Sequence, residues 1–350
     1  RGSAMPVEAR VVVIPQEAGA GPEVMDVTLP DPRGHQVVVK QYASGVCHSQ
    51  LHTIHNPRAA PQVLGHESTG EVIAVGDDVT SLAPGDTVMV TWVPKDQASA
   101  RRRGGPLQLD LGDGRTATSI NVFTWATHTI ADEMFVVKVP EGIDVEATSI
   151  IGCAVITGAG AVLHTAGVKA AFVGADPIIA VDLSEEKLEF AKRFGATHGV
   201  NASSADPVEE IRALTTDEQR FDILRQPLRG VDFAFDCIGH QSTMEQIHQA
   251  TRSGEFGQSH GGTAVLVGVP QRNLELDTLH LFIGERAFIS SLGGSCEPAV
   301  DFPRFLQWHA DGDLDLDALV TQQYAIDDIG QAVDDLENGR IAGRSILVFD

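Results

Sequence analysis

Residues 65–79 read Gly-His-Glu-Ser-Thr-Gly-Glu-Val-Ile-Ala-Val-Gly-Asp-Asp-Val, and they are the most informative stretch of this chain. His66 precedes a short β-rich run that ends at a turn signal. Two further motifs carry thiols: Cys47 lies in Gly45-Val-Cys-His-Ser49, and Cys153 follows Gly152. Two thiolates and one imidazole leave a fourth position for water or substrate, which is typical of catalytic zinc; a structural zinc fills all four positions.

The composition limits the class of protein. The chain has 350 residues, enough for two domains, and 43% of them are hydrophobic. Its net charge of −23, from 25 basic and 48 acidic residues, argues against a nucleic acid or an anionic membrane as partner. The 4 cysteines do not resemble a disulfide framework, which favours a reducing, cytoplasmic compartment.

Residues 7–150 have the pattern of a mostly β domain. Short β-rich runs bounded by Gly and Pro occur at 11–14, 36–39, 71–75 and 87–90. Residues 107–111 and 115–119 flank Gly-Asp-Gly and predict a hairpin.

After Cys153 the pattern changes to alternating strands and helices. Residues 178–182 form an apolar run that ends in Asp182, as a buried parallel strand does. Ser184 is the expected N-cap of a helix that ends at Gly195. Further strands are expected at 233–237 and 263–267, so the region predicts a parallel sheet with crossover helices.

The remaining segments are two polar stretches and the tail. Residues 216–229 and 253–260 are expected to be surface loops, and their role is left open. In the tail, helices are expected at 301–310 and 326–336 and a strand at 345–349. We assign the tail to the first domain.

The three motifs together resemble the zinc-dependent medium-chain alcohol dehydrogenase family. The resemblance implies an α/β fold: a β-rich GroES-like catalytic domain of residues 1–154 and 297–350, and a Rossmann-type, doubly wound parallel-sheet NAD-binding domain of residues 155–296. It also implies reversible hydride transfer between a small alcohol and NAD, in a homodimer or homotetramer.

The resemblance assigns Cys47, His66 and Cys153 as zinc ligands. Zinc lowers the pKa of a coordinated hydroxyl and polarises a carbonyl, which is the help that alcohol oxidation needs. Glu67 matches a family acid behind the metal, where it orients the site or binds zinc transiently; a buried ion pair is the structural alternative. Taken singly, the cysteines would be small buried apolar residues and the histidine a core residue.

Proton transfer and substrate binding involve three more residues by resemblance. Ser49 is expected to hydrogen-bond the alcohol oxygen, and His52 to complete the relay to solvent, because imidazole exchanges protons near neutral pH. Trp92 is expected to line the alcohol pocket, with core packing as the alternative.

The chain departs from the family pattern in two places. Gln50 replaces a common Asp that accepts a hydrogen bond from the histidine ligand. An amide oxygen still accepts, but without a charge, which predicts a less basic ligand and a more electrophilic zinc. Residues 94–121 contain no cysteine, although many members have a four-cysteine lobe there. We therefore expect one catalytic zinc per chain and no structural zinc.

On the cofactor side, Asp182 is expected to bind the adenosine ribose and select NAD over NADP. The remaining predicted cofactor residues, all matched by resemblance, are His48, Thr157, Lys187, Val267, Val269, Leu292 and Arg344.

The glycine-rich turn expected before Asp182 is absent. Only 13 residues lie between Val168 and Asp182, whereas a strand–helix–strand unit needs about 30. The first strand and its turn are therefore missing near Val168–Ala171. Either the sequence omits residues next to Lys169, or the protein lacks them; the intact flanks favour omission.

The main prediction is NAD-linked oxidation of a primary or secondary alcohol. One alternative is a thiol-adduct formaldehyde dehydrogenase, which needs basic residues at the pocket mouth. A second, if the gap is a true deletion, is a zinc-binding relative that cannot bind the dinucleotide.

Overall fold

The computed structural model describes residues 6–17, 19–102, 107–167, 174–255 and 257–350. The chain divides into two compact units: Thr157–Cys296 forms the second, and the residues on either side of it form the first. Among the described residues, none of the helices combines the length and apolar character needed to cross a membrane.

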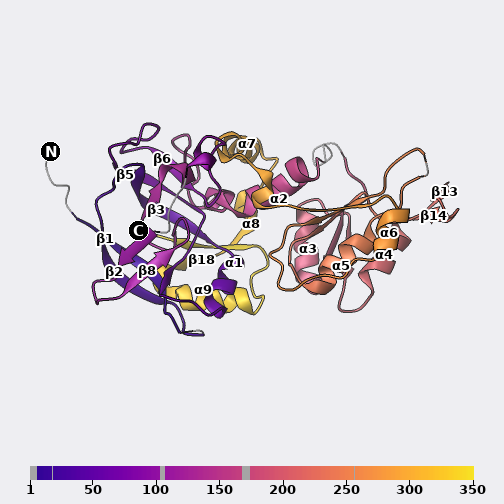
Figure 1. The fold of residues 1–350 in the computed structure, drawn as a ribbon, viewed down its shortest axis with the longest axis horizontal. Coiled ribbons are helices and arrows are strands. Elements are labelled where there is room, and N and C mark those ends of the chain that lie inside the picture. The colour runs from indigo at the N-terminus through magenta and orange to yellow at the C-terminus, as the bar shows by residue number, and fades with distance from the viewer. Residues whose placement is uncertain (1–5, 18, 103–106, 168–173, 256) are drawn as a thin grey trace. The chain divides into compact units, whose positions relative to one another are not determined.

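The strands of the first unit form two sheets (Figure 1). One has the order β2 (Glu23–Leu29), β1 (Val7–Ile14), β4 (Gln62–Val63), β8 (Thr116–Ser119), β7 (Leu107–Asp110). The other has the order β10 (Val136–Lys138), β6 (Thr87–Val90), β5 (Ser68–Val75), β3 (Gln36–Val46), β19 (Arg344–Val348), β18 (Val320–Ala325), and β9 (His128–Asp132) also pairs with β3. The predicted hairpin is β7–β8.

The helical segments of this unit are α1 (Ser49–His55), α7 (Pro298–Asp311), α8 (Leu316–Leu319), α9 (Ile329–Glu337), and the turns η1 (Ser99–Arg101), η2 (Glu133–Phe135), η3 (Ala147–Gly152) and η6 (Ile326–Asp328). The tail joins this unit through both sheet and core. Strand β19 lies between β3 and β18. The apolar face of α9, including Ile329 and Val333, is buried with Val12 and Leu347 in one hydrophobic cluster.

The second unit is built around parallel strands: β11 (Ile179–Asp182), β12 (His198–Asn201), β15 (Phe233–Asp236), β16 (Thr263–Leu266) and β17 (Ala287–Ser290). Its helical segments are η4 (Ala161–Thr165), α3 (Glu185–Arg193), α4 (Pro207–Leu214), α5 (Gln241–Ala250), α6 (Thr278–Ile283) and η5 (Gly293–Ser295), and α2 (Ala154–Gly160) spans the boundary. The Ser184 side chain caps α3 as predicted, by accepting from Lys187 N–H. Within the expected loop 216–229, β13 (Asp217–Phe221) pairs instead with β14 (Pro227–Leu228).

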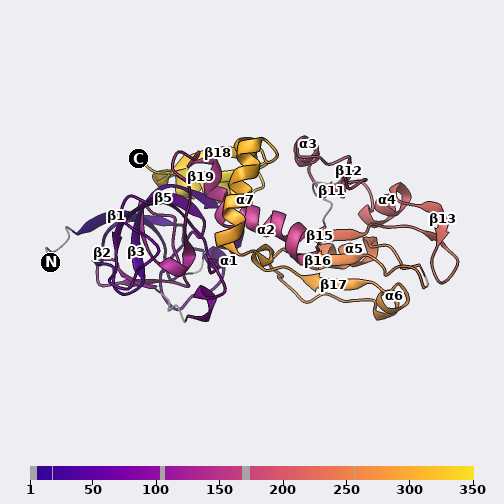
Figure 2. The same ribbon diagram turned by 90° about the horizontal axis from the view of Figure 1, so that it is seen from above.

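The parallel strands of the second unit form two separate sheets. Strand β11 pairs only with β12 among the described residues, and β15, β16 and β17 lie side by side (Figure 2). A doubly wound sheet has the strand order 3-2-1-4-5-6. The observed strands match positions 3-2 and 4-5-6, and no described strand occupies position 1. The predicted gap at Val168–Ala171 itself lies outside the described residues.

Candidate metal centre

Two neighbouring strands bring the first two predicted ligands together. Strands β3 and β5 are antiparallel, with Ser44 opposite Ser68. Cys47 follows the end of β3, and His66 immediately precedes the start of β5, so both lie at the same end of the sheet. The Gly45 N–H donates to the Glu67 carbonyl at 3.1 Å and continues the ladder to this point.

The third predicted ligand arrives from a turn packed on the same strands. Turn η3 contacts β3, β5 and β6. The Thr91 hydroxyl donates to the Gly152 carbonyl at 2.6 Å, and Ala154 N–H donates to Glu67 Oε2 at 3.0 Å. These two bonds fix the backbone on both sides of Cys153.

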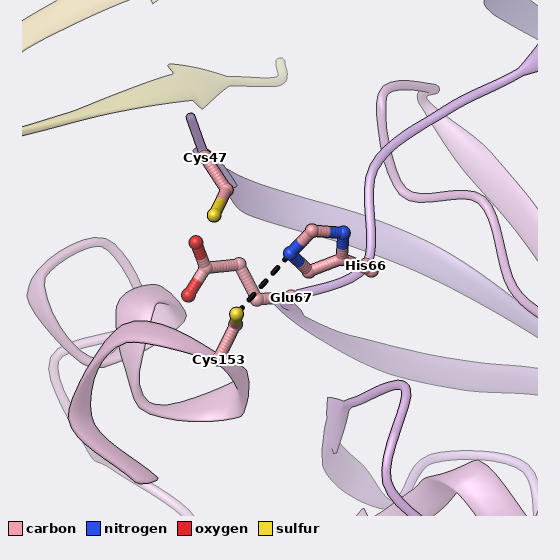
Figure 3. Close-up of side chains that lie close together, drawn as sticks. All are labelled: Cys47, His66, Glu67 and Cys153. Atoms are coloured by element: carbon pink, nitrogen blue, oxygen red, sulfur yellow. Dashed lines mark hydrogen bonds between the residues drawn. The ribbon is translucent and has the colours of Figure 1, made fainter. Parts of the chain in front are cut away.

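The ligand atoms of Cys47, His66, Glu67 and Cys153 all lie within 4.8 Å of one another. Figure 3 shows the two sulfurs and one ring nitrogen directed toward a common space, with the Glu67 carboxylate beside them. The ring nitrogen that faces this space is Nε2 of His66, 3.2 Å from Cys153 Sγ. Two sulfurs and one imidazole at this spacing suit Zn²⁺, and a carboxylate oxygen of Glu67 lies within the same group of candidate ligand atoms.

The two thiols differ in acidity. A hydrogen bond from Cys153 lowers the pKa of Cys47 well below its ordinary value; burial opposes this shift, while His66 and Arg344 add to it. The same hydrogen bond, together with burial, raises the pKa of Cys153. One thiolate is thus favoured before a metal arrives, and the second thiol must lose its proton when a metal binds.

Glu67 is completely buried, and both of its oxygens have partners. Arg344 Nη2 donates to Oε1 at 2.7 Å, and Ala154 N–H donates to Oε2. Burial raises the pKa of Glu67, and the Arg344 charge opposes that rise. Gly45 makes this arrangement possible, because a Cβ at residue 45 would lie 2.3 Å from Glu67 Oε1.

The position of Arg344 shows a contact that the sequence interpretation did not assign. A role for Arg344 at the pyrophosphate stays a prediction; in the structure its guanidinium lies against Glu67. The sequence had allowed a buried ion pair for Glu67 without indicating its partner. These two residues are 277 positions apart, so no local pattern could connect them.

The structure corrects the predicted hydrogen bond of Gln50. We expected its amide oxygen to accept from His66. Instead Oε1 accepts from Gly65 N–H at 2.9 Å, and the amide Nε2 lies 2.6 Å from His66 Nδ1. The reason is local: Gly65 adopts φ +91°, where a Cβ would lie 2.4 Å from the Trp125 nitrogen, and its N–H points at Gln50.

The predicted proton-transfer residues lie on α1, beside the cluster. The Ser49 hydroxyl donates to Cys47 Sγ at 3.4 Å. His52 is three residues further along the helix and therefore lies on the same face. His48 is the N-cap residue of α1. Trp92 is partly buried and packs against an apolar cluster that includes Val37 and Val90, and its place in the alcohol pocket stays a prediction. Its Nε1 is buried without a partner among the described residues.

The other predicted cofactor residues belong to the second unit, apart from His48 and Arg344. Asp182 ends β11, and one of its oxygens accepts from Ser184 N–H. Val267 and Val269 follow β16, and Leu292 follows β17, at the carboxyl ends of parallel strands. Lys187 lies in α3 and Thr157 in α2. Carboxyl ends of parallel strands are where doubly wound sheets bind ligands.

Comparison with known proteins defines the class. Residues 33–141 match the alcohol dehydrogenase GroES-like domain, and residues 161–311 match the zinc-binding dehydrogenase domain. The chain is 30% identical to S-(hydroxymethyl)glutathione dehydrogenase of Paracoccus denitrificans, covering 95% of this chain and 98% of the relative. It is 31% identical to alcohol dehydrogenase class-3 of Cereibacter sphaeroides, with the same coverage.

The fold comparison agrees. Benzyl alcohol dehydrogenase from Acinetobacter calcoaceticus superposes with a TM-score of 0.82 at 27% identity, over 98% of this chain and 100% of that one. The α/β fold, with its Rossmann-type unit, is therefore that of a zinc-binding dehydrogenase. The chain belongs to the zinc-dependent medium-chain alcohol dehydrogenase family.

The alignment with the Paracoccus relative also measures what this chain lacks. It spans 380 positions, whereas 95% of 350 residues is about 332 residues. Roughly 48 positions therefore carry a residue in the relative and none here. The absence of a described strand at position 1 of the sheet, between β11 and β15 in the doubly wound order, is consistent with part of this difference.

Proposed function

We propose that this protein oxidises a primary or secondary alcohol to an aldehyde or ketone, reversibly, with one zinc ion per chain and NAD as the hydride acceptor. The observation that carries the proposal is the convergence of Cys47, His66 and Cys153 within 4.8 Å in the first unit. When bound there, zinc supplies Lewis-acid chemistry that acidifies a hydroxyl and polarises a carbonyl.

The chain's own side chains then handle the proton. In this proposal the Ser49 hydroxyl, which lies beside Cys47, accepts the proton of a substrate hydroxyl as it gives up its own proton toward His52 on the same helix. The Glu67–Arg344 pair lies behind the ligands and keeps a compensated negative charge close to them. Glu67 is fully buried, so solvent does not reach its carboxylate.

Metal content tests the site. We expect one zinc per purified chain, and its loss in Cys47→Ser. Cys237→Ser is the matched control, because Cys237 lies in the second unit outside the ligand cluster. Elemental analysis of the three proteins, with an absorbance screen at the nicotinamide band over a panel of alcohols, provides the readouts. Retention of zinc in Cys47→Ser contradicts the assignment.

The relatives' names favour a second substrate class. Two of them are named for S-(hydroxymethyl)glutathione or as class-3 alcohol dehydrogenases. NADH formation from formaldehyde that requires added glutathione would support a thiol-adduct substrate, and equal turnover of simple alcohols without a thiol would support the main proposal.

The divided sheet favours another candidate, a zinc-binding relative that cannot bind the dinucleotide. The glycine turn that follows strand 1 normally contacts the pyrophosphate at a helix N-terminus. Titration of NAD and of NADP against the purified protein distinguishes these possibilities. Micromolar NAD binding supports the enzyme, stronger NADP binding contradicts the role of Asp182, and no binding supports the relative. The dimer or tetramer and the cytoplasmic location remain predictions.

A further inference from the structure

Gln50 lies between two nitrogen atoms, and its amide can satisfy both in only one protonation pattern of His66. The side chain is 8% exposed, so solvent contributes little to its hydrogen bonding. Its Oε1 accepts from Gly65 N–H at 2.9 Å, and its Nε2 lies 2.6 Å from Nδ1 of His66. Since an amide nitrogen only donates, Nδ1 must be the acceptor in this arrangement.

An acceptor at Nδ1 places the ring proton of neutral His66 on Nε2. That nitrogen faces Cys153 Sγ at 3.2 Å and can donate to it. A metal bound by Cys47, His66 and Cys153 needs the lone pair of the same Nε2. The ring proton must then move to Nδ1, which becomes a donor directed at Gln50.

Metal binding therefore leaves two donors, Gly65 N–H and His66 Nδ1–H, facing one amide. An amide has a single oxygen, so in either orientation its NH₂ group opposes one of these donors. A carboxylate has two oxygens and could accept from both. We infer that Gln50 stabilises the metal-free form of His66, and that this site binds zinc more weakly than the same site with a carboxylate at residue 50.

This inference rests on the proposed zinc site, and it differs from ordinary support of a metal ligand. A supporting partner strengthens metal binding, and its loss typically weakens affinity by about 10–100-fold. Here the expected sign is the opposite. Removal of the amide relieves the conflict between donors, so it should leave zinc affinity unchanged or increase it.

The test compares zinc dissociation constants, measured by competition with a chromophoric chelator, for three variants. Gln50→Glu has the same shape and two acceptor oxygens, and we expect zinc affinity to rise by about 10–100-fold. Gln50→Met keeps the length but has no amide, and we expect affinity within about threefold of the parent, or tighter. Gln331→Glu adds the same charge at an exposed position of α9 and should leave affinity unchanged.

A second measurement needs no substitution at residue 50. In the metal-free protein labelled with ¹⁵N-histidine, we expect the proton of His66 on Nε2, and on zinc loading we expect it on Nδ1. His66→Ala identifies the resonances. A proton on Nδ1 in the metal-free protein would overturn the inference.

The outcomes separate this inference from the proposed function. Zinc binding in the parent that weakens by more than threefold in Gln50→Met overturns the inference and leaves the zinc site in place. Failure of Gln50→Glu to bind more tightly than the parent also overturns it. Absence of zinc binding in the parent and in every variant removes the zinc site and the inference together.

Discussion

Gly45 provides the space that the Glu67 carboxylate occupies behind the ligands, and no larger residue fits there without displacing that carboxylate. The glycine is thus part of the metal centre although it donates no ligand atom. Its backbone N–H also donates to the Glu67 carbonyl. Residue 45 therefore affects both the backbone hydrogen bonding at the end of β3 and the space for the Glu67 carboxylate.

We expect Gly45→Ala to lose zinc and to lower the free energy of unfolding by about 1–3 kcal/mol, because the added methyl overlaps a buried carboxylate. Urea denaturation and zinc analysis measure the two effects. Gly330→Ala is the control: nothing lies near its Cβ position on α9, so we expect no loss, or a gain of up to about 1 kcal/mol. Equal stability of Gly45→Ala and the parent would contradict the packing argument.

Arg344→Met should be strongly destabilising, by about 3–5 kcal/mol, because it leaves the fully buried Glu67 without its cation. The control is Arg340→Met, whose partners are the exposed Asp334 and the partly exposed Asp335; we expect a change below about 1 kcal/mol. Urea denaturation with a chelator present gives both values. If the pair is the cause, adding Glu67→Gln to Arg344→Met recovers part of the loss.

The sequence predicted which candidate ligands lie together better than it predicted their surroundings. Cys47, His66 and Cys153 are carried by local motifs whose chemistry is visible in the residues themselves. The Glu67–Arg344 pair and the orientation of the Gln50 amide are features of the tertiary structure. They depend on strand register and on the backbone at Gly65, which no single motif encodes.

At the level of elements, the two parallel sheets of the second unit differ in how their strands are paired. Strand β16 has a partner on each side, whereas β11 and β15 each have one among the described residues. Val181 in β11 is 40% exposed, although the apolar run 178–182 has the pattern of a buried strand. Among the described residues, β11 has a strand on one side only.

Hydrogen exchange should show this difference directly. We expect amides of β16 to be strongly protected, and about half of those in β11 and β15 to exchange quickly, because their outer hydrogen-bonding edges are open. Mass spectrometry of peptides covering the three strands provides the measurement. Uniform strong protection would mean that another strand fills the position.

Helix α6 carries a pH-sensitive group. Burial lowers the pKa of His280 to about 4, and the charges of Arg286 and His248 add to the shift. Unfolded histidine takes up a proton near pH 6.5, so acid favours the unfolded chain. The stability contributed by neutral His280 is complete above about pH 6.5 and is lost as pH falls toward 4.

Because His280 is only partly buried and solvent screens its charge, the expected loss over this range is on the order of 1 kcal/mol. Urea denaturation at about pH 7 and about pH 4.5 measures it. His280→Gln should be less sensitive to acid than the parent. The control His260→Gln should behave like the parent, because His260 is 91% exposed. Identical acid sensitivity of all three proteins would contradict this assignment.

The sequence anticipated most regular elements, because strand runs and the Ser184 cap are local signals. The β13–β14 hairpin was missed, since 216–229 is polar and has no alternating apolar pattern. The absence of the glycine turn was visible in the sequence. The division of the parallel strands into two sheets could be seen only from the strand pairing in the structure.

For the whole molecule, the net charge of −23 sets the response to salt. Repulsion among like charges destabilises the compact state, and ions screen it over about 10 Å at 0.1 M salt. We expect the thermal midpoint to rise as sodium chloride is added from low ionic strength. Differential scanning fluorimetry measures the shift, with an uncharged sugar at equal osmolality as the comparison. A falling midpoint would contradict the role of charge.

The position of β19 has a consequence for biosynthesis. This strand completes the sheet that carries Cys47, yet residues 344–348 leave the ribosome after all of Thr157–Cys296. The second unit can begin to fold on the nascent chain. The ion pair between Glu67 and Arg344 can form only when translation is nearly complete. Metal acquisition is therefore expected to be a late, post-translational event, and ribosome-bound intermediates should be zinc-free.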